Sequence, residues 1–271
     1  MKELKILKKA VKAAGKEVLK CYRSGFKINY KEDKSPLTQA DLSSNAILRE
    51  MLAETGYPVL SEEDADDLKR LNGAKVWIID PLDGTMDFVQ ETGEFSVMVG
   101  LVEEERPILG AVFQPATGEL FYAEKGRGAF RESGLGQKEK LQVSPIKETK
   151  ESRMVVSRNH LKPEDESLAA KLQIQEMKKV GSNGVKIAKI AAGEADFFVN
   201  TGSGMGEWDS CGPDIILQEA GGILTDKFGK EIIYNKKEPV LKNGLIAGNK
   251  DLHRKIVENL NAESMESGIK E

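Results

Sequence analysis

The chain begins with a helical pattern of hydrophobic positions. Between Lys2 and Tyr22 an apolar residue recurs every three or four positions, at Leu4, Leu7, Val11, Ala14, Val18 and Tyr22. This spacing predicts a helix with one buried face, and Gly25 is expected to end it. Because a residue before proline avoids the helical conformation, the charged segment leading to Ser35 and Pro36 should be extended.

A second helix is predicted after Thr38, whose side chain can cap a helix N-terminus. Its apolar positions lie between Ala46 and Leu52, and Gly56 is expected to end it. Asp41 falls in the first turn of this helix. An acidic side chain at that place ordinarily compensates the helix dipole, and this is its interpretation from the residues alone.

Strand patterns follow. Tyr57 to Leu60 predicts a short strand that leads into the acidic segment SEEDADD, from Ser61 to Asp67. Such a segment is typically a solvated loop, yet Glu62 or Glu63 could reach a pocket beside the next strand. Residues 76–79 predict that strand, with Asp80 at its end and Pro81 stopping it. The runs FSVMVGLVEE, RPILGAVFQP and ELFYAEKG then predict an antiparallel meander.

Strands and helices alternate in the second half of the chain, which indicates an α/β layer. Strands are predicted in RMVVS, near residues 177–180, and in ADFFV, GILTD and LKNGLIAG, with helices starting near Glu164, Asn183, Trp208 and Asp251. The polar stretch between about Arg131 and Ser152 separates this layer from the meander. We therefore expect an α+β domain over residues 1–148 and an α/β domain over residues 149–271.

Composition narrows the possible partners and location. With 39% hydrophobic and 31% charged residues the chain resembles folded, soluble proteins. Its formal net charge of −4, with the two signs interspersed, gives no support for binding a nucleic-acid polymer. No apolar window of about 18 residues or signal-peptide core is present, so we expect no membrane contact and a cytoplasmic location. Cys21 and Cys211 lie too far apart for a disulfide framework or a zinc site.

The stretch WIIDPLDGT, from Trp77 to Thr85, concentrates groups that suit metal and phosphate chemistry. It places Asp80 and Asp83 three residues apart and follows them with Gly84, whose backbone N–H is unhindered. Hard divalent cations take several oxygen ligands, and phosphate binds to such cations and to exposed N–H groups. This combination predicts a magnesium-dependent phosphatase.

Other sites that bind metals or phosphates fit the chain poorly. The acids and glycine of DPLDGT do not have EF-hand spacing, and no GxxxxGK[ST] motif of a P-loop occurs. The segment TGSGMG, from Thr201 to Gly206, suggests a dinucleotide-dependent oxidoreductase. Its spacing is GxGxG, however, and Glu207 and Asp209 would place negative charge where a pyrophosphate must bind.

Three longer motifs together resemble the inositol monophosphatase superfamily of lithium-sensitive, magnesium-dependent phosphatases. They are Ser61-Glu62-Glu63, WIIDPLDGT, and EWDSCGPDIILQEAGG from Glu207 to Gly222. They occur in the family's order and span nearly the whole chain. The resemblance implies an αβαβα sandwich, as in the inositol monophosphatase and fructose-1,6-bisphosphatase fold. The segments VVSRNH and VGSNGVKIAKIAAGEADFFV are most similar to the 3'(2'),5'-bisphosphate nucleotidase branch.

The resemblance also implies roles for individual residues. Two to three Mg²⁺ would be held by Glu62, Asp80, the Leu82 carbonyl, Asp83 and Asp209. Thr85, hydrogen-bonded to Asp41, would orient and deprotonate the attacking water, with Glu62 as an alternative proton acceptor. The N–H groups of Gly84 and Thr85 would hold phosphate oxygens. Four further residues would lie near the nucleotide or sugar: Ser157, His160, Ser182 and Lys186.

The implied function is removal of the 3'-phosphate of 3'-phosphoadenosine 5'-phosphate to give AMP. Asn200 stands where some nucleotidases carry an arginine, so inositol monophosphate and fructose-1,6-bisphosphate stay open as alternative substrates. A non-catalytic module with the same fold is a further alternative, although such a module would not need Asp41 and Thr85 together with all four metal-binding carboxylates. The resemblance leaves a monomer and a homodimer equally open.

Overall fold

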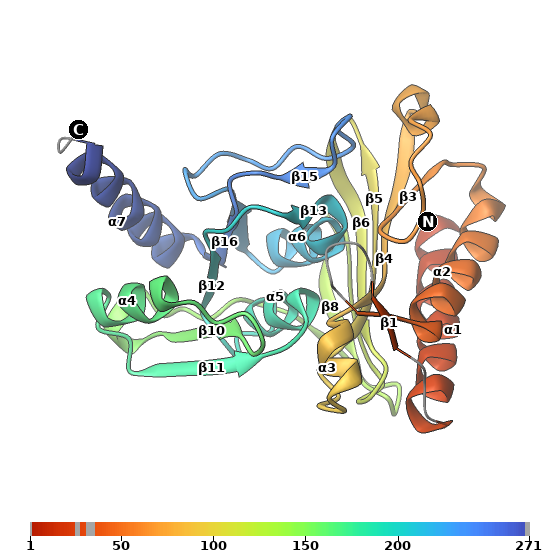
Figure 1. Cartoon of the computed structure of the whole chain (residues 1–271), viewed down its shortest axis with the longest axis horizontal. Coiled ribbons are helices and arrows are strands. Elements are labelled where there is room, and N and C mark those ends of the chain that lie inside the picture. Colours follow the sequence, from red (N-terminus) through yellow and green to blue (C-terminus); the bar gives the residue numbers. More distant parts are fainter. Residues whose placement is uncertain (1, 25–27, 31–35, 269–271) are drawn as a thin grey trace.

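The computed structural model describes residues 2–24, 28–30 and 36–268, which form five layers (Figure 1). Two helices cover one face of a seven-stranded sheet, two more lie between this sheet and a five-stranded sheet, and a third pair covers the far side. This arrangement confirms the predicted αβαβα sandwich. The helices of these layers are α1 (Lys2–Ser24), α2 (Gln39–Leu52), α5 (Asn183–Ala191), α6 (Cys211–Glu219), α4 (Pro163–Lys171) and α7 (Lys250–Gly268), in layer order, and a short helix, α3 (Thr85–Val89), follows β4 (Lys75–Asp83).

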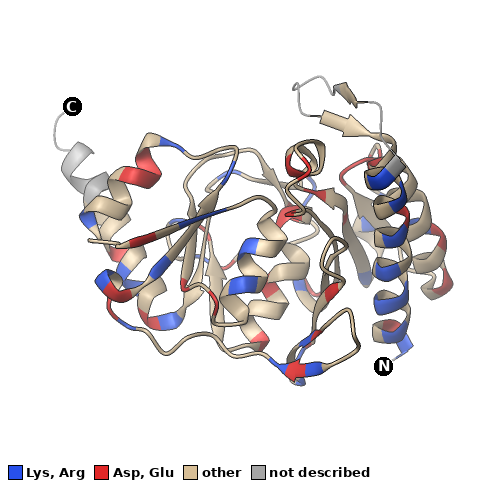
Figure 2. Cartoon of the chain, turned by 90° about the horizontal axis from the view of Figure 1, so that it is seen from below, with Lys and Arg blue, Asp and Glu red and all other residues tan. Residues whose placement is uncertain are grey.

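The first helix behaves as its periodicity predicts. Its apolar positions Leu7, Val11 and Ala14 are fully buried against the large sheet and α2. The opposite side carries exposed lysines, which form a line along α1 in Figure 2. Thr38 caps α2 as expected, and Gly56 ends the short 3₁₀ turn that follows α2. Gly25 and residues 31–35 lie outside the described residues.

The large sheet keeps its strands in chain order, with β3 parallel to β4 and every later pair antiparallel. The predicted meander is therefore confirmed, and it continues through β8 and β9 into the stretch expected to be irregular. All three residues of β9 are exposed, so no hydrophobic alternation marks this strand. The strands are β3 (Val59–Ser61), β4 (Lys75–Asp83), β5 (Ser96–Glu103), β6 (Arg106–Gln114), β7 (Glu119–Glu124), β8 (Gly128–Glu132) and β9 (Lys138–Lys140).

The smaller sheet has the order β11-β10-β12-β16-β14, with the first three strands parallel and the last two pairings antiparallel. Its strands match the predicted runs: β10 (Arg153–Ser157), β11 (Glu176–Val180), β12 (Phe197–Asn200), β14 (Gly222–Thr225) and β16 (Leu245–Asn249). Two two-stranded ribbons complete the described chain: β1 (Ile28–Tyr30) with β2 (Pro36–Thr38), and β13 (Met205–Gly206) with β15 (Val240–Leu241).

Three predicted boundaries were wrong. Pro81 does not end its strand, because β4 continues to Asp83 through a shift in its pairing with β5. The helix expected from Trp208 begins as a 3₁₀ turn, Glu207–Asp209, and α6 itself starts at Cys211. The segment LKNGLIAG is two strands, since Gly244 adopts a positive φ between β15 and β16.

None of the helices within the described residues combines the length and apolar character needed to cross a lipid bilayer. The central hydrophobic core joins side chains of the large sheet, such as Met98 and Val112, to α5, α6 and the smaller sheet. It therefore crosses residue 148, where the two predicted domains meet. The division into two domains stays a prediction.

Glycines allow α6 to lie very close to the large sheet. A Cβ atom at Gly110 would be 2.3 Å from the Gly212 carbonyl oxygen and 2.4 Å from Ile215 Cγ2. At Gly100 it would be 2.3 Å from Cys211 Sγ. Because a larger residue at either position would push α6 away, this contact sets how closely the start of α6 approaches β5 and β6.

We expect Gly110→Ala to lower the free energy of unfolding by about 1–3 kcal/mol, since the added methyl group overpacks the contact with α6. Urea denaturation measures the effect. Gly134→Ala is the control, because Gly134 is exposed and a Cβ there would be 3.2 Å from its nearest neighbour, the Thr117 carbonyl oxygen. Equal stability of the two variants would contradict the close packing described above.

Candidate active site

A cleft of about 610 Å³ opens between the two sheets. One side is formed by the loop after β3, the end of β4 and the turn after it. The other side is formed by the loops after β10, β11 and β12 and by the turn before α6. Eight of the residues singled out from the sequence line it: Glu62, Asp83, Gly84, Thr85, Ser157, His160, Lys186 and Asp209.

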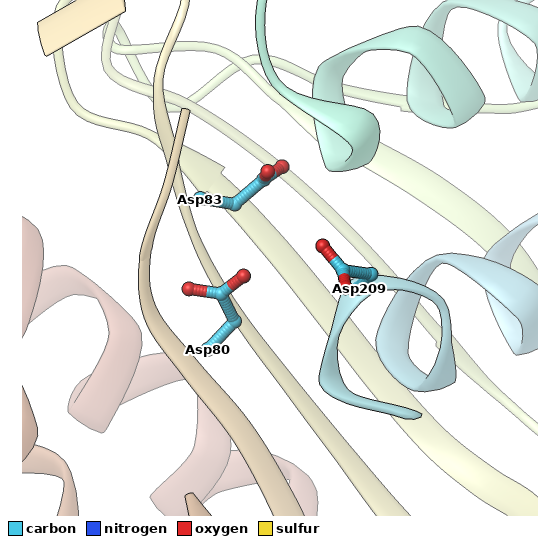
Figure 3. A group of neighbouring side chains, drawn as sticks. All are labelled: Asp80, Asp83 and Asp209. Carbon is cyan, nitrogen blue, oxygen red and sulfur yellow. The ribbon is translucent and has the colours of Figure 1, made fainter. Parts of the chain in front are cut away.

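Three carboxylates meet at the inner end of the cleft. Asp80, Asp83 and Asp209 each offer an oxygen atom, and these atoms all lie within 4.8 Å of one another. Figure 3 shows the first two on β4 and the third on the turn before α6. The sequence places Asp209 more than a hundred residues after the other two, so the fold alone brings the group together.

The irregular end of β4 explains how two aspartates three residues apart serve one site. In a regular strand, the side chains of residues that are an odd number of positions apart point to opposite faces of the sheet. Asp80 pairs with Met98 and Asp83 with Ser96, so the β4 side of this interval is one residue longer than the β5 side. This bulge at Pro81 returns Asp83 to the face that Asp80 occupies. The Leu82 N–H donates to Asp80 Oδ1 at 3.0 Å and steadies the bulge.

Hydrogen bonds hold the other two carboxylates in place. Asp83 accepts the Gly184 N–H at 2.8 Å and the Ser182 hydroxyl, both at the N-terminus of α5. Asp209 accepts the Gly206 N–H at 2.6 Å and the Asn183 side-chain amide at 3.1 Å. The start of α5 therefore contacts both aspartates and links β4 to the turn before α6.

Burial and mutual repulsion make this group costly to ionise. The pKa of Asp80 is raised well above its ordinary value by burial and then by the charges of Glu62, Asp83 and Asp209. Burial, followed by the charges of Asp83 and Glu62, raises the pKa of Asp209 to about 7. Glu62 is half-buried at the edge of the cleft and lies near enough to Asp80 for a hydrogen bond.

This donor set fits a divalent cation. Several carboxylate oxygens converge on one point, and bringing them together without positive charge is unfavourable. The Leu82 carbonyl oxygen, which the resemblance also assigned to the metal, lies 3.1 Å from Thr85 Oγ1 and is an alternative acceptor to Asp41 for the one Thr85 hydroxyl hydrogen. Leu82 itself is buried behind the cleft.

Asp41 and Thr85 lie side by side next to the carboxylate group. Thr85 Oγ1 is 3.2 Å from Asp41 Oδ1, which is the hydrogen bond implied by the resemblance. Asp41 Oδ2 accepts the Thr38 N–H at 2.7 Å and the Thr38 hydroxyl at 2.6 Å, forming the capping box of α2. Asp41 thus both caps the helix and faces Thr85. Burial raises its pKa, and the charge of Glu62 acts in the same direction.

The turn after Asp83 presents backbone groups to the cleft. Gly84 adopts a φ of +83° and caps α3 (Thr85–Val89), and both Gly84 and Thr85 line the cleft. A Cβ at Gly84 would be 3.3 Å from Ser182 and 3.1 Å from the Glu94 carbonyl oxygen. The positive φ and the close neighbours together explain why glycine occupies this position.

The four residues assigned to the substrate lie in different surroundings. Lys186 is buried on α5 but lines the cleft, donates to the Gly181 carbonyl at 2.6 Å and lies over the Phe198 ring. Burial lowers its pKa to about 8. Ser157 and His160 line the outer wall, where Ser157 Oγ accepts the His160 N–H at 3.2 Å. Ser182 is fully buried and contacts Asp83, so it lies behind the cleft lining.

Sequence reasoning missed several residues of this cleft, and two of them, Asn183 and Asp87, bear on the site. Asn183 lines it and donates to Asp209, and Asp87 lines it from α3. Asn183 directly follows Ser182 within a quoted motif, and Asp87 comes three residues after Gly84. Proximity to the motifs was the available signal, since neither residue has a distinctive spacing of its own.

Comparisons with known proteins place this geometry in a family. The inositol monophosphatase family matches residues 2–265. The chain belongs to this family. The predicted resemblance is thereby confirmed, and Asp80, Asp83 and Asp209 all lie within the matched residues. Members of the inositol monophosphatase family are metal-dependent, which agrees with the fit of Asp80, Asp83 and Asp209 to a cation.

Individual relatives support the nucleotidase branch of the family. The 3'(2'),5'-bisphosphate nucleotidase CysQ of Aggregatibacter actinomycetemcomitans is 35% identical, covering 86% of this chain and 87% of that protein. The solved CysQ structure from Bacteroides thetaiotaomicron is 30% identical with a TM-score of 0.76, covering 89% of this chain and 94% of that one. An IMPase of Thermotoga maritima is 26% identical with a TM-score of 0.83, covering 98% and 99%.

We expect Asp80→Asn to stabilise the metal-free protein at neutral pH by about 1–3 kcal/mol. The pKa of Asp80 is raised, so its ionisation above the usual aspartate range disfavours folding, and stability falls as pH rises toward the folded-state pKa. Asparagine removes this charge and keeps the acceptor for the Leu82 N–H. Urea unfolding in EDTA measures the gain.

In millimolar Mg²⁺ the order should reverse, because the wild-type protein gains more from the cation than the variant does. Asp67→Asn is the control, since the Asp67 carboxylate is exposed and pairs with Lys69. A metal-free Asp80→Asn protein that is less stable than wild type would contradict the repulsion argument.

Proposed function

We propose that this chain removes the 3'-phosphate of 3'-phosphoadenosine 5'-phosphate, giving AMP, with Mg²⁺ as its cofactor. The chain is a phosphoric monoester hydrolase of the inositol monophosphatase family, as the sequence predicted. The observation that carries the proposal is the convergence of Asp80, Asp83 and Asp209 beside the Thr85–Asp41 pair in a cleft with room for a substrate. Similarity to CysQ nucleotidases over most of the chain selects the substrate.

Two to three Mg²⁺ would be held by Glu62, Asp80, Asp83 and Asp209, with the Leu82 carbonyl as a further oxygen ligand. When bound, the metal supplies positive charge that stabilises the phosphoryl oxygens in the transition state and acidifies water. The four carboxylates carry about four negative charges when ionised, which such cations can balance. Both the number of bound ions, two to three, and their identity as Mg²⁺ are proposed.

Thr85 and Asp41 are proposed to handle the proton of the attacking water. The Thr85 hydroxyl donates to Asp41 Oδ1, which leaves a lone pair of Thr85 Oγ1 free to accept a hydrogen from water. The raised pKa of Asp41 makes it a stronger base than an exposed aspartate. Because its other oxygen is held by Thr38, Asp41 keeps this orientation without substrate.

The remaining residues are proposed to bind the ester. The N–H groups of Gly84 and Thr85 would hold phosphate oxygens at the turn after β4. On the opposite wall, Ser157, His160 and Lys186 would contact the nucleoside, and Ser182 would act through Asp83. Structures similar to this chain support inositol monophosphate as the second candidate substrate, since an IMPase of Thermotoga maritima shares its fold closely. A cytoplasmic location and a monomeric or homodimeric state stay predictions.

We expect Asp83→Asn to abolish phosphate release, by at least about a thousandfold in kcat, because it removes charge from the cation site. Asparagine fills the same volume, so circular dichroism should stay unchanged, and the unfolding midpoint in EDTA should not fall, because one repelling charge is removed. Asp67→Asn, at an exposed site, should keep full activity. Retention of most phosphate release in a folded Asp83→Asn protein would refute the assigned site.

Side-by-side kinetics should favour 3'-phosphoadenosine 5'-phosphate over inositol 1-phosphate and fructose-1,6-bisphosphate in kcat/KM. Activity should require Mg²⁺, disappear in EDTA and fall in millimolar Li⁺, as the family resemblance implies. A preference for inositol 1-phosphate would instead support inositol monophosphate as the substrate of this chain. Hydrolysis that persists in both EDTA and Li⁺ would exclude the metal-dependent mechanism altogether.

A further inference from the structure

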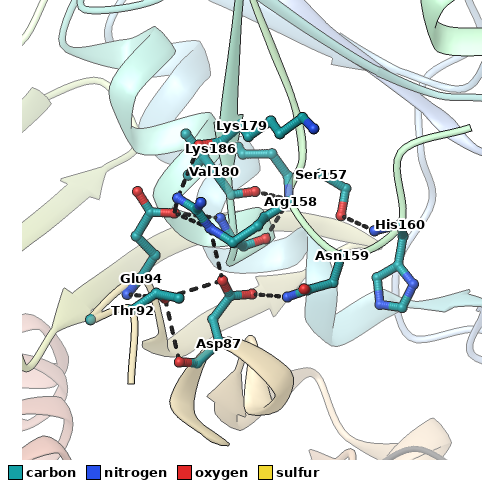
Figure 4. A network of polar contacts seen from close by, with 12 residues as sticks. Asp87, Thr92, Glu94, Ser157, Arg158, Asn159, His160, Lys179, Val180 and Lys186 are labelled. Carbon is teal, nitrogen blue, oxygen red and sulfur yellow. Dashed lines mark hydrogen bonds and ion pairs between the residues drawn. The ribbon is translucent and has the colours of Figure 1, made fainter. Parts of the chain in front are cut away.

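An ion-pair network lies beside the wall of the cleft that carries Ser157 and His160. Arg158 projects from the loop after β10 toward α3 and the segment that follows it (Figure 4). Its Nη2 is 2.7 Å from Glu94 Oε2, and its Nε is 3.3 Å from Asp87 Oδ1. The neighbouring Asn159 donates to Asp87 Oδ2 at 2.9 Å. Two consecutive residues of this loop therefore hold carboxylates that come from the first half of the chain.

The network extends to the residues that hold the catalytic carboxylates. Glu94 Oε2 also accepts the Gly181 N–H at 2.9 Å, and the Glu94 carbonyl oxygen accepts the Ser182 N–H at 2.9 Å. Ser182 in turn donates to Asp83. Gly181 packs so tightly on Asp87 that a Cβ there would be 2.2 Å from the Asp87 carboxyl carbon. Arg158 thus connects the outer wall of the cleft to the segment that positions Asp83.

Charge gives this network a consequence for substrate binding. The Asp87 side chain is 4% exposed and lines the cleft, and Glu94 lies next to it. Burial raises the pKa of Asp87, while the hydrogen bond from Thr92 and the charge of Arg158 lower it. A substrate with two phosphates would be repelled by two uncompensated carboxylates at this wall. The Arg158 guanidinium offsets one of these two charges, the Lys186 ammonium also interacts with both carboxylates, and Ser157 and His160 still face the cleft.

We propose that Arg158 is a positioning residue that partly neutralises Asp87 and Glu94 and thereby fits the Ser157–His160 wall to a substrate carrying a second phosphate. This inference rests on the proposed nucleotidase function and assigns selectivity for the doubly phosphorylated substrate to a residue behind the wall. Arg158 is not one of the described residues that line the cleft. Its effect on substrate binding is therefore indirect, through Asp87, Glu94 and the loop that carries Arg158.

The test compares two substrates that differ only in the second phosphate: 3'-phosphoadenosine 5'-phosphate and adenosine 3'-phosphate. In Arg158→Gln we expect KM for the first to rise roughly tenfold, while KM for the second changes less than about threefold. Arg158→Lys keeps the charge without the planar fork and should recover part of the loss. The double variant Arg158→Gln/Glu94→Gln removes one carboxylate as well, and should lower the KM of the first substrate back toward wild type.

Arg131→Gln is the matched control. Arg131 on β8 pairs with Glu119 and Glu194, has a side-chain exposure of 24% against 35% for Arg158, and lies outside the cleft lining. It should leave both KM values unchanged. Unfolding midpoints in EDTA, measured for every variant, separate a loss of stability from a loss of selectivity.

Each outcome decides one of the two proposals. A wild-type enzyme that does not favour the bisphosphate over adenosine 3'-phosphate refutes the proposed function, and the inference falls with it. If wild type does favour the bisphosphate, an equal rise of KM for both substrates in Arg158→Gln overturns the role of Arg158 alone. Failure of the double variant to recover would likewise overturn it, because neutralisation requires that removing Glu94 relieve the loss.

Discussion

The close contact between α6 and strands β5 and β6 is the constraint on which the site depends. Asp209 lies on the turn just before this helix, so its distance from Asp80 and Asp83 is set by how deeply α6 sits on the sheet. Glycines at positions 100, 110 and 212 remove the side chains that would hold the helix away. Backbone packing therefore imposes a carboxylate arrangement that electrostatics opposes, and the buried core around α6 supplies the free energy that maintains it.

Repulsion within the carboxylate group is only partly relieved by the protein. Asp83 and Asp209 receive hydrogen bonds from the start of α5. Burial raises the pKa of Asp83, and its hydrogen bonds and the Lys186 ammonium on the same helix oppose this rise only in part. Asp80 accepts the Leu82 N–H and keeps a strongly raised pKa. This imbalance leaves negative charge concentrated around Asp80, where a divalent cation gains most. The hydrogen bonds to the aspartates thus offset only part of their negative charge, and a bound cation would offset most of the rest.

Periodicity predicted the long elements well because burial of one face leaves a clear record in the sequence. Helix α1 and strands β5 to β7 were found this way, whereas β9 is exposed on every residue and left no such record. The bulge at Pro81 could not be predicted, since it becomes necessary only once Asp80 and Asp83 must face one side. Motif resemblance predicted substrate contacts for Lys186 and Ser182, but their burial depends on how α5 packs between the sheets, a long-range property absent from local patterns.

In the proposed function, one wall of the cleft serves the chemistry and the other the selectivity. Strand β4, the turn after it and Asp209 carry the groups proposed to bind metal and activate water, and these groups are held by the large sheet and α6. The outer wall comes from loops after β10 and β12, whose side chains can change without disturbing that core. Relatives named for nucleotidase and for inositol phosphatase activity share this fold at TM-scores of 0.76 and 0.83, so the fold does not distinguish their substrates. In the proposed function the difference lies in the loop residues, and Arg158 ties the loop after β10 to Asp87 and Glu94, close to the turn that carries Gly84 and Thr85.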